Sequence, residues 1–332
     1  MTLNNKSILI TGGTGSFAKA FLEKILIRYK NIKRIVIYSR DELKQFDLAN
    51  KYKEKKFNNL RFFIGDVRDK SRLSMALNEI DIVVHAAALK QVPAAEYNPF
   101  EAIKTNVIGC QNLIEACFEN KVKRVVALST DKAAAPVNLY GATKLCSDKL
   151  MVAANNIKGN KKISFSVVRY GNVMGSRGSV IPQFLKQSKS KIINITDPRM
   201  TRFNITLNDS VEMVIWSIFN CYGGEILVPK IPSYNILDLA KAISPDSKIN
   251  ITGIRQGEKI HEDLITNSDS YNTYDLGKYY IILQNLDKNI LKKYKKNFRI
   301  RKVKENFVYS SGTNKKFLNS KELKNLIKFN VK

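Results

Sequence analysis

The first half of the chain alternates short apolar runs with longer segments of helical periodicity, and few folds accommodate that rhythm. The runs are nearly continuous in Ile, Val, Leu and Phe, as expected for strands buried on both faces of a sheet. They cover Ser7–Thr11, Arg34–Tyr38, Arg61–Gly65, Asp81–Ala86, Arg124–Ser129 and Ser164–Arg169. Helical segments between them are clearest at Ser16–Tyr29, Ser71–Asn78, Pro99–Glu119 and Tyr140–Asn155. This alternation predicts an α/β fold with a Rossmann-type, doubly wound parallel sheet.

The rhythm stops after Arg169. Glycines and prolines then punctuate a polar, irregular stretch, and helical patterns return at Asn208–Asn220 and Ile236–Ile243. We therefore expect residues 1–170 to form the sheet domain. Residues 171–332 are expected to be mainly a smaller substrate-binding region, of which a part can pack back on the first domain.

Composition narrows the class of protein. No apolar run reaches the roughly 18 residues that span a bilayer, and the polar start Met1–Lys6 leads directly into a strand, so we expect a cytoplasmic protein without membrane insertion. The net charge of +27 raises nucleic-acid binding as an alternative. The excess is spread along the chain, although it is densest at Lys288–Lys304, and no aromatic–basic recognition motif accompanies it. We therefore expect no nucleic-acid partner.

The four cysteines include no Cys-x-x-Cys pair, and neither His85 nor His261 lies near one. No metal site is therefore expected, and the cysteines are interpreted as small buried residues in a reducing compartment. His85, inside an apolar run, is expected to be a packed core histidine rather than a ligand.

A glycine-rich turn ends the first run and opens the first helix. Its glycines allow a tight turn and a close approach of the backbone to a pyrophosphate, which rests on the helix N-terminus. Strand, turn and helix in this order favour dinucleotide binding strongly. The residues expected to bind the cofactor here are Gly12, Thr14, Gly15, Ser16 and Phe17.

Ser39 and Arg40 follow the second run, ahead of Asp41 and Glu42. An acidic side chain at this place binds the ribose 2′-hydroxyl of NAD, whereas serine and arginine suit the 2′-phosphate of NADP. Because Ser39 and Arg40 come first, we expect NADP, and residues 1–170 are then an NADP-binding domain.

The ends of the third and fourth runs offer further cofactor contacts. Asp66, which precedes Val67, can accept a hydrogen bond from the adenine amino group. The small side chains of Ala86 and Ala87 let a ribose lie against the backbone. Lys90 can reach a phosphate of the cofactor or of a substrate, although a solvated lysine is nearly as compatible with the sequence.

A hydroxyl, a carboxylate and an ammonium follow the fifth run, at Thr130, Asp131 and Lys132. Further on, Tyr140 and Lys144 are four residues apart and so lie on one face of a helix. An ammonium beside a phenol lowers the pKa of the phenol from about 10 toward working pH, so Tyr140 is a candidate general base. Alone, the pair is equally typical of a solvated helix face. Its place after the fifth strand of a cofactor-binding sheet favours catalysis.

Together these residues resemble the extended short-chain dehydrogenases/reductases, from about Lys6 through at least Glu262. More narrowly, the chain resembles the inverting 4,6-dehydratases of UDP-N-acetylglucosamine, which begin pseudaminic acid synthesis for flagellin glycosylation. The motifs that carry this narrower resemblance are Tyr38–Lys44, Ser129–Ala133, Tyr170–Val173, Gly175–Val180, Met200–Phe203 and Gly253–Lys259.

The resemblance implies a mechanism. Tyr140, assisted by Lys144 and Thr130, takes the proton from the sugar O4 while hydride leaves C4 for the nicotinamide. Lys132 then removes the C5 proton, Asp131 protonates the departing C6 hydroxyl, hydride returns to C6, and C5 is reprotonated on the opposite face. Relatives that retain the C5 configuration have Asp-Glu where this chain has Asp131-Lys132, so the lysine implies inversion. As a base, Lys132 is expected to have a depressed pKa, which Lys144 and the cofactor environment can supply.

The resemblance also assigns binding residues. Those implied for UDP-N-acetylglucosamine are Lys90, Asn172, Ser179, Val180, Thr201, Arg255 and Glu258, and those added for the cofactor are Asp41, Lys44, Val67, Tyr140 and Lys144. Arg255 suits a diphosphate and Glu258 a ribose or uracil contact. Ala18, Gln91 and Asn204 depart from the family pattern, which has Gly, His and an aromatic residue there. Asn204 bears on sugar specificity more than on catalysis.

Two other functions remain open at this point. Another NADP-dependent nucleotide-sugar epimerase or reductase would share the fold, although Asp131-Lys132 argues against it. The non-enzyme alternative is a cofactor-sensing or RNA-associated protein. The presence of all three catalytic candidates, Thr130, Tyr140 and Lys144, argues against it. The resemblance implies a homo-oligomer of unspecified size. The sequence does not indicate whether the product serves flagellin, capsule or lipopolysaccharide.

Overall fold

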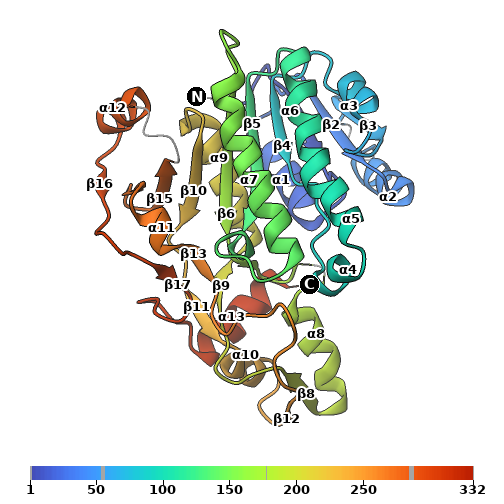
Figure 1. Ribbon diagram of the computed structural model, residues 1–332. Helices are drawn as coiled ribbons and strands as arrows, with labels where there is room; N and C mark the ends of the chain where they lie inside the picture. Colours follow the sequence, from blue (N-terminus) through green and yellow to red (C-terminus); the bar gives the residue numbers. More distant parts are fainter. Residues whose placement is uncertain (1, 54–56, 177, 284–287, 332) are drawn as a thin grey trace.

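A large sheet forms the centre of the molecule in the computed structural model, which describes residues 2–53, 57–176, 178–283 and 288–331 (Figure 1). Its parallel strands are β1 (Ser7–Thr11), β2 (Arg34–Ser39), β3 (Leu60–Ile64), β4 (Ile82–His85), β5 (Arg124–Thr130), β6 (Ser164–Tyr170) and β10 (Glu225–Pro229). Antiparallel strands β15 (Tyr279–Leu283), β14 (Thr273–Asp275) and β16 (Arg301–Lys302) extend the β10 edge. The strand order is β16-β14-β15-β10-β6-β5-β4-β1-β2-β3.

Helices cover both faces of this sheet, which explains why its strands are nearly continuous apolar runs. Helices α1 (Ser16–Arg28) and α9 (Leu207–Asn220) pack on one face. Helices α3 (Lys70–Ala76), α6 (Gly109–Glu119) and α7 (Leu139–Ile157) pack on the other. The predicted doubly wound α/β fold is confirmed. The ends of its predicted strands lie within one residue of those observed.

The predicted helix Pro99–Glu119 is interrupted. It consists of α5 (Pro99–Ile103), a π-helical turn over Lys104–Ile108, and α6. The π turn contains Asn106, whose side chain donates to Leu89 O at 2.9 Å and to Thr143 Oγ1 at 3.0 Å and accepts from Leu89 N at 2.8 Å. The interruption therefore ties the loop after β4 to α7, and π turns of this kind recur at functional sites.

The second half of the chain is divided between the main sheet and a smaller lobe. Strands β10, β14, β15 and β16 belong to the main sheet. The lobe, at the bottom of Figure 1, packs α8 (Val180–Gln187), α10 (Ile236–Ile243) and α13 (Ser320–Asn330) into a separate apolar cluster. Its paired strands are β7 (Asn172–Val173) with β9 (Thr201–Ile205) and β11 (Ser233–Asn235), and β8 (Ile192–Ile195) with β12 (Lys248–Ile251).

Several short or polar elements lie outside the predicted set. They are α2 (Glu42–Lys53), α4 (Val92–Tyr97), α11 (Asn267–Ser270), α12 (Lys288–Asn297), and the pair β13 (Asp263–Ile265) and β17 (Tyr309–Ser310). Two 3-10 turns, η2 (Asp131–Ala133) and η3 (Ser188–Ser190), complete the secondary structure of the described residues. Within those residues, no helix combines the length and the apolar character needed to cross a membrane.

Candidate active site

A cavity of about 1490 Å³ runs along the carboxyl ends of the parallel strands and reaches the smaller lobe. This edge is where open α/β sheets bind their ligands. All the residues predicted to bind the cofactor line it: Gly12, Thr14, Gly15, Ser16, Phe17, Ser39, Arg40, Asp41, Lys44, Asp66, Val67, Ala86, Ala87, Lys90, Tyr140 and Lys144. Asn172, Ser179, Val180, Arg255 and Glu258 line the part nearer the lobe.

The glycine turn between β1 and α1 leaves room for a ligand against the backbone. Gly12 has φ +62°, and a Cβ there would lie 2.9 Å from the backbone of Ala86 and Ala87. Gly15 is the N-cap of α1, so the first N–H groups of this helix have no side-chain cap. Thr11 holds the facing loop, because its Oγ1 accepts from Ala86 N and Ala87 N at 3.2 Å. The cradle fits a dinucleotide pyrophosphate.

The end of β2 combines one exposed cation with a neutralised carboxylate. Asp41 forms an ion pair with Lys44 and also accepts from Lys44 N at 2.9 Å. Arg40 is about half exposed and lies 3.6 Å from Asp66 Oδ2. Ser39 Oγ accepts from Gln45 Nε2 at 3.0 Å. An anion entering here would meet Arg40 rather than an unpaired acid.

Arg68 is a partner of Asp66 that sequence reasoning missed. It donates to both Asp66 oxygens at 2.9 Å, through its backbone N–H and its guanidinium. Burial favours the neutral form of Asp66, but the hydrogen bonds and charge of Arg68 outweigh it, so the pKa of Asp66 is lowered. Asp66 therefore remains a carboxylate at the edge of the cavity, with part of its accepting capacity already used.

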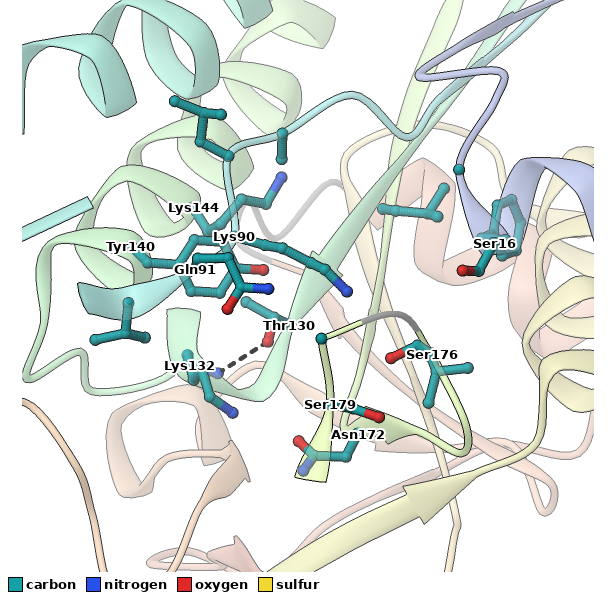
Figure 2. Close-up of a pocket in the computed structure, with 18 of the residues that line it drawn as sticks. Ser16, Lys90, Gln91, Thr130, Lys132, Tyr140, Lys144, Asn172, Ser176 and Ser179 are labelled. Carbon is teal, nitrogen blue, oxygen red and sulfur yellow. Dashed lines mark hydrogen bonds between the residues drawn. The ribbon is translucent and has the colours of Figure 1, made fainter. Parts of the chain in front are cut away.

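Thr130, Lys132, Tyr140 and Lys144 gather on one side of the cavity, facing Asn172, Ser176 and Ser179 (Figure 2). Thr130 caps the turn η2, with Lys132 N donating to its Oγ1 at 3.4 Å, and its hydroxyl donates to Asp131 Oδ1 at 2.9 Å. Asp131 itself is fully buried and does not line the cavity. It connects to the cavity through Thr130 and Lys132, which do.

Tyr140 lies in the first turn of α7, where Asn138 is the N-cap and accepts from Gly141 N at 2.8 Å. Burial is the main influence on the phenol and raises the pKa of Tyr140 to about 12, although the charge of Lys132 and a hydrogen bond with Thr130 act to lower it. The expectation that Lys144 lowers this pKa toward working pH is therefore wrong for the protein alone. The desolvation of a fully buried phenol outweighs its neighbours.

Lys132 also departs from expectation. Burial by itself lowers the pKa of Lys132, but the carboxylates of Asp131 and Glu262 outweigh that effect, so the pKa is raised above its ordinary value. The Nζ atom lies 3.1 Å from Asp131 Oδ1 and 3.3 Å from Glu262 Oε1. The predicted depressed pKa is wrong for the protein alone, because opposite charges within hydrogen-bonding distance favour the ammonium form.

Helix α7 is fixed to the sheet one turn beyond Lys144. Asp148 accepts from Ser129 Oγ at 2.7 Å and from Arg169 Nη2 at 3.2 Å, which joins α7 to β5 and β6. Lys144 itself is buried and lines the cavity. His85 behaves as predicted, because it is buried in the sheet with its Nδ1 2.8 Å from Thr11 Oγ1.

Thr201 is not at the cavity surface, contrary to expectation. Its hydroxyl lies 2.8 Å from both His261 Nδ1 and Ser311 Oγ, inside the lobe. Arg202 lines the cavity instead, because successive residues of strand β9 face opposite sides. Arg255 and Glu258 are at the cavity, and their charged atoms are 3.9 Å apart.

The three residues that depart from the family pattern lie in different parts of the structure. Gln91 caps α4 and lines the cavity, and a Cβ on Gly178 would lie 2.2 Å from its Nε2, so the loop after β7 passes directly over it. Asn204 is buried in β9 opposite Asn172. Ala18 is fully buried in α1 and packs in the core.

Glu262 and Arg202 also line the cavity, and sequence reasoning missed both. Glu262 comes three residues after the motif Gly253–Lys259, and Arg202 lies inside Met200–Phe203, so the motifs were the available signal. Their chemistry depends on tertiary placement beside Lys132, which no local pattern encodes.

The chain is similar to known proteins over nearly its whole length. A family model described as polysaccharide biosynthesis protein matches residues 8–284. The chain is 54% identical to a UDP-N-acetylglucosamine 4,6-dehydratase (inverting) of Campylobacter jejuni over 98% of each chain. It is 42% identical to a UDP-glucose 4-epimerase of Rickettsia bellii, over 97% of this chain and 95% of the relative. The X-ray structure of Pen from Bacillus thuringiensis superposes with a TM-score of 0.89, at 38% identity and 99% coverage of both chains.

Proposed function

The chain belongs to the polysaccharide-biosynthesis family of extended short-chain dehydrogenases/reductases, and from that membership we propose that it is a UDP-N-acetylglucosamine 4,6-dehydratase that inverts the sugar at C5. The observation that carries the proposal is the placement of Asp131 and Lys132 beside Tyr140 at the end of β5. An epimerase or reductase needs to handle the O4 proton alone, whereas dehydration also needs a base at C5 and an acid at C6.

The cavity supports a nicotinamide dinucleotide held by the glycine turn, the end of β2 and Lys144. When bound, this cofactor accepts the hydride of C4 and returns it to C6, so the sugar is oxidised and then reduced within one turnover. We propose NADP rather than NAD, because Arg40 is available to an anion while Asp41 is paired with Lys44. In Arg40→Ala, the affinity for NADP should fall at least tenfold, and that for NAD should change little. Equal affinities of the variant and the wild type for NADP would refute this assignment.

Tyr140 is proposed to handle the O4 proton, with Thr130 hydrogen-bonded to it and Lys144 on the same helix face. A phenol with a pKa of about 12 is protonated at neutral pH. Tyr140 therefore needs a further positive charge nearby before it can act as a base, and an oxidised nicotinamide supplies one.

The elimination step is proposed to use Lys132 as base and Asp131 as acid. Lys132 Nζ donates to Asp131 Oδ1 at 3.1 Å. Transfer of one proton across this contact yields a neutral amine and a neutral carboxylic acid, the two forms that elimination requires. The C5–H bond breaks with its proton going to Lys132 and its electron pair moving toward the C4 carbonyl. That pair then forms the C5–C6 double bond as the C6–O bond breaks, and the C6 hydroxyl takes the proton of Asp131 and leaves as water. Thr130 and Lys132, both hydrogen-bonded to Asp131, connect the acid to the cavity.

The lobe is proposed to hold the nucleotide sugar, with Arg255 near the diphosphate and Asn172, Ser179 and Glu258 around the sugar and nucleoside. Residues 171–332 would then be mainly the substrate-binding region, although their strands β10, β14, β15 and β16 continue the main sheet. We also propose that the enzyme works in the cytoplasm as a homo-oligomer and begins pseudaminic acid synthesis, which serves flagellin glycosylation in the enzymes that its motifs resemble. The family resemblance supports these assignments.

Incubation with UDP-N-acetylglucosamine in D₂O tests the reaction itself. We expect a product that has lost one water, carries deuterium at C5 and has the L-arabino configuration by NMR, namely UDP-2-acetamido-2,6-dideoxy-β-L-arabino-hex-4-ulose. Lys132→Ala should not form it at a rate near that of the wild type. A product of unchanged composition that is epimeric at C4 would favour the epimerase alternative, which the Rickettsia relative motivates.

A further inference from the structure

Glu262 is a buried carboxylate that reaches the catalytic region from a different part of the chain than Asp131. It directly precedes β13, and its backbone is fixed to the lobe, because Glu262 N donates to Ser311 Oγ at 2.9 Å and Ser311 N donates to Glu262 O at 2.8 Å. Its side chain lines the cavity although only 3% of the residue is exposed. The carboxylate is therefore held rigidly where the lobe meets the end of β5.

The ammonium of Lys132 lies between two carboxylates. Asp131 Oδ1, from the same turn, is 3.1 Å from Nζ, and Glu262 Oε1, from the lobe, is 3.3 Å away. One of the three ammonium donors is used by Asp131 Oδ1, and the contact with Glu262 is an ion pair. Together they fix the amine in position at the end of a long, flexible side chain.

A second set of contacts holds the segment that carries Glu262. Arg202 donates to the carbonyl oxygens of Lys259 and Ile260, both at 2.9 Å, and Lys259 Nζ donates to Ala134 O at 2.8 Å, just after the turn η2. The segment that contains Arg255 and Glu258 is thus attached to the turn that carries Lys132. Binding of a nucleotide to that segment and the orientation of Lys132 are physically connected through Glu262.

The Glu262 carboxylate lies among cations that border the cavity. Buried carboxylates are costly unless their oxygens are fully satisfied. Among the described residues, Glu262 Oε2 has no hydrogen-bond partner, and Lys259 Nζ lies 3.9 Å from it. In the part of the chain that the structure describes, three cations lie within 4 Å of this carboxylate, and Lys132, at 3.3 Å, is nearer than Arg202 and Lys259, at 3.9 Å. The charge of Glu262 therefore acts most strongly on Lys132.

We propose that Glu262 is a positioning residue for Lys132, which it orients toward C5 of the sugar and stabilises as the ammonium that forms there. The inference rests on the proposed dehydratase function. In that step the C5–H bond breaks, the proton goes to Lys132 Nζ, and the electron pair moves toward the C4 carbonyl. A negative charge 3.3 Å from the new ammonium favours this transfer.

The titratable and charged groups that face Lys132 come from several elements. Those recorded around it are Asp131 in its own turn, Glu262 before β13, Arg202 in β9, Tyr140 in α7 and Tyr234 in β11. Of these, Asp131 and Glu262 favour the ammonium and Arg202 opposes it. Removal of the Glu262 charge should therefore lower the pKa of Lys132 and weaken it as a base.

The test compares Glu262→Gln with the wild type, with Glu262→Asp as the conservative variant and Glu225→Gln as the matched control. Glu225 is also a fully buried carboxylate, but it accepts from Tyr222 N, Gly223 N and Tyr294 Oη in the core, away from the cavity. With UDP-N-acetylglucosamine, Glu262→Gln should lower kcat at least about tenfold with little change in KM. Reduced nicotinamide should accumulate in the Glu262→Gln variant, because C4 oxidation proceeds while elimination slows. Near-ultraviolet absorbance measures this accumulation.

Glu262→Asp should recover part of kcat, and Glu225→Gln should lose thermal stability without accumulation of reduced nicotinamide. The inference is overturned if Glu262→Gln keeps the wild-type kcat, or if it loses activity without accumulation. If instead the wild type forms no dehydrated product, the proposed function fails, and a second measurement then tests the contact between Glu262 and Lys132 alone.

That measurement is the pH dependence of Lys132 acylation by an anhydride reagent, followed by peptide mass spectrometry. The Glu262→Gln profile should shift to lower pH, and coincident profiles would refute the inference.

Discussion

At the scale of single residues, the site depends on a glycine that lets the catalytic side chains Tyr140 and Thr130 approach each other. Gly141 follows Tyr140 directly, and a Cβ there would lie 2.2 Å from Lys132 O. The first turn of α7 therefore contacts the turn η2 with no side chain between them, which brings Tyr140 to the hydroxyl of Thr130. The sequence motif around Tyr140 could be recognised without structure. The reason for its glycine could not, because Lys132 O meets it only in three dimensions.

Gly141→Ala should separate these two turns. The added methyl group must displace backbone, which cannot rotate away as a side chain can, so we expect a loss of roughly 1–3 kcal/mol in the free energy of unfolding. We also expect a larger fall in kcat than in cofactor affinity, since the glycine turn after β1 is untouched. Urea unfolding, kcat and cofactor titration measure these effects. Gly159→Ala is a partial control, because a Cβ there meets nothing within 4 Å, although its positive φ adds some strain. Unchanged kcat in Gly141→Ala would contradict the expectation.

His85 makes stability depend on pH. Burial, assisted by the charge of Lys144, lowers the pKa of His85 to about 3. The unfolded chain binds a proton at this histidine below its ordinary pKa near 6.5, whereas the folded chain does not until about pH 3. Protons therefore favour unfolding in this window, and stability is lost as the pH falls from 6.5.

His85→Asn should remove this dependence while keeping an acceptor near Thr11. Between pH 7 and pH 5, the wild type should lose about 2 kcal/mol more in the free energy of unfolding than the variant does. The difference between the two slopes is the measurement, because other groups titrate in both proteins and cancel. Parallel slopes would show that His85 is protonated in the folded state as easily as in the unfolded chain.

At the scale of elements, strands were predicted more accurately than helices. The strands β1, β2, β4, β5 and β6 are buried along most of their length, whereas β3 lies at the sheet edge, and the apolar runs mark the ends of all six within one residue. Helix α2 was missed because few of its residues are buried, among them Leu48 and Tyr52, and its composition is polar. The π turn in Pro99–Glu119 was missed because helix continues on both sides of it, as α5 and α6.

Asn106→Ala should test the function of the π turn. The substitution removes three hydrogen bonds that join the loop after β4 and α7 to this turn, so we expect a loss of about 2 to 3 kcal/mol in the free energy of unfolding. Cofactor affinity should also fall, because Ala86, Ala87 and Lys90 lie on that loop. Asn120→Ala is a suitable control, since its side chain bonds to Ser74 Oγ and Ala116 O, away from the cavity. Equal effects of both variants on cofactor affinity would assign Asn106 a purely structural role.

At the scale of the whole molecule, the site forms where the sheet edge meets the smaller lobe. The residues at the strand ends were predicted because parallel strands present their carboxyl ends at one edge. Contacts that cross from the lobe, such as Glu262 and Arg202 to Lys132, were not predicted, because more than sixty residues separate the partners. Thr201 was misplaced for a related reason. A motif identifies a strand, but the direction in which its residues face depends on the sheet to which it belongs.

The net charge of +27 also belongs to the whole molecule, and it has a consequence for a nucleotide-sugar substrate. A positively charged protein attracts an anionic diphosphate before contact. Salt screens this attraction, and at 0.1 M it is largely lost beyond about 10 Å. For UDP-N-acetylglucosamine, kcat/KM should therefore fall several-fold from low to physiological ionic strength, while kcat should change little. Competition by uridine and by UMP separates the causes, because only the anionic UMP should inhibit less as salt rises. If salt weakens both competitors equally, the effect lies in the stability of the lobe. If it weakens neither, the positive charge does not act on the substrate, and its excess reflects composition alone.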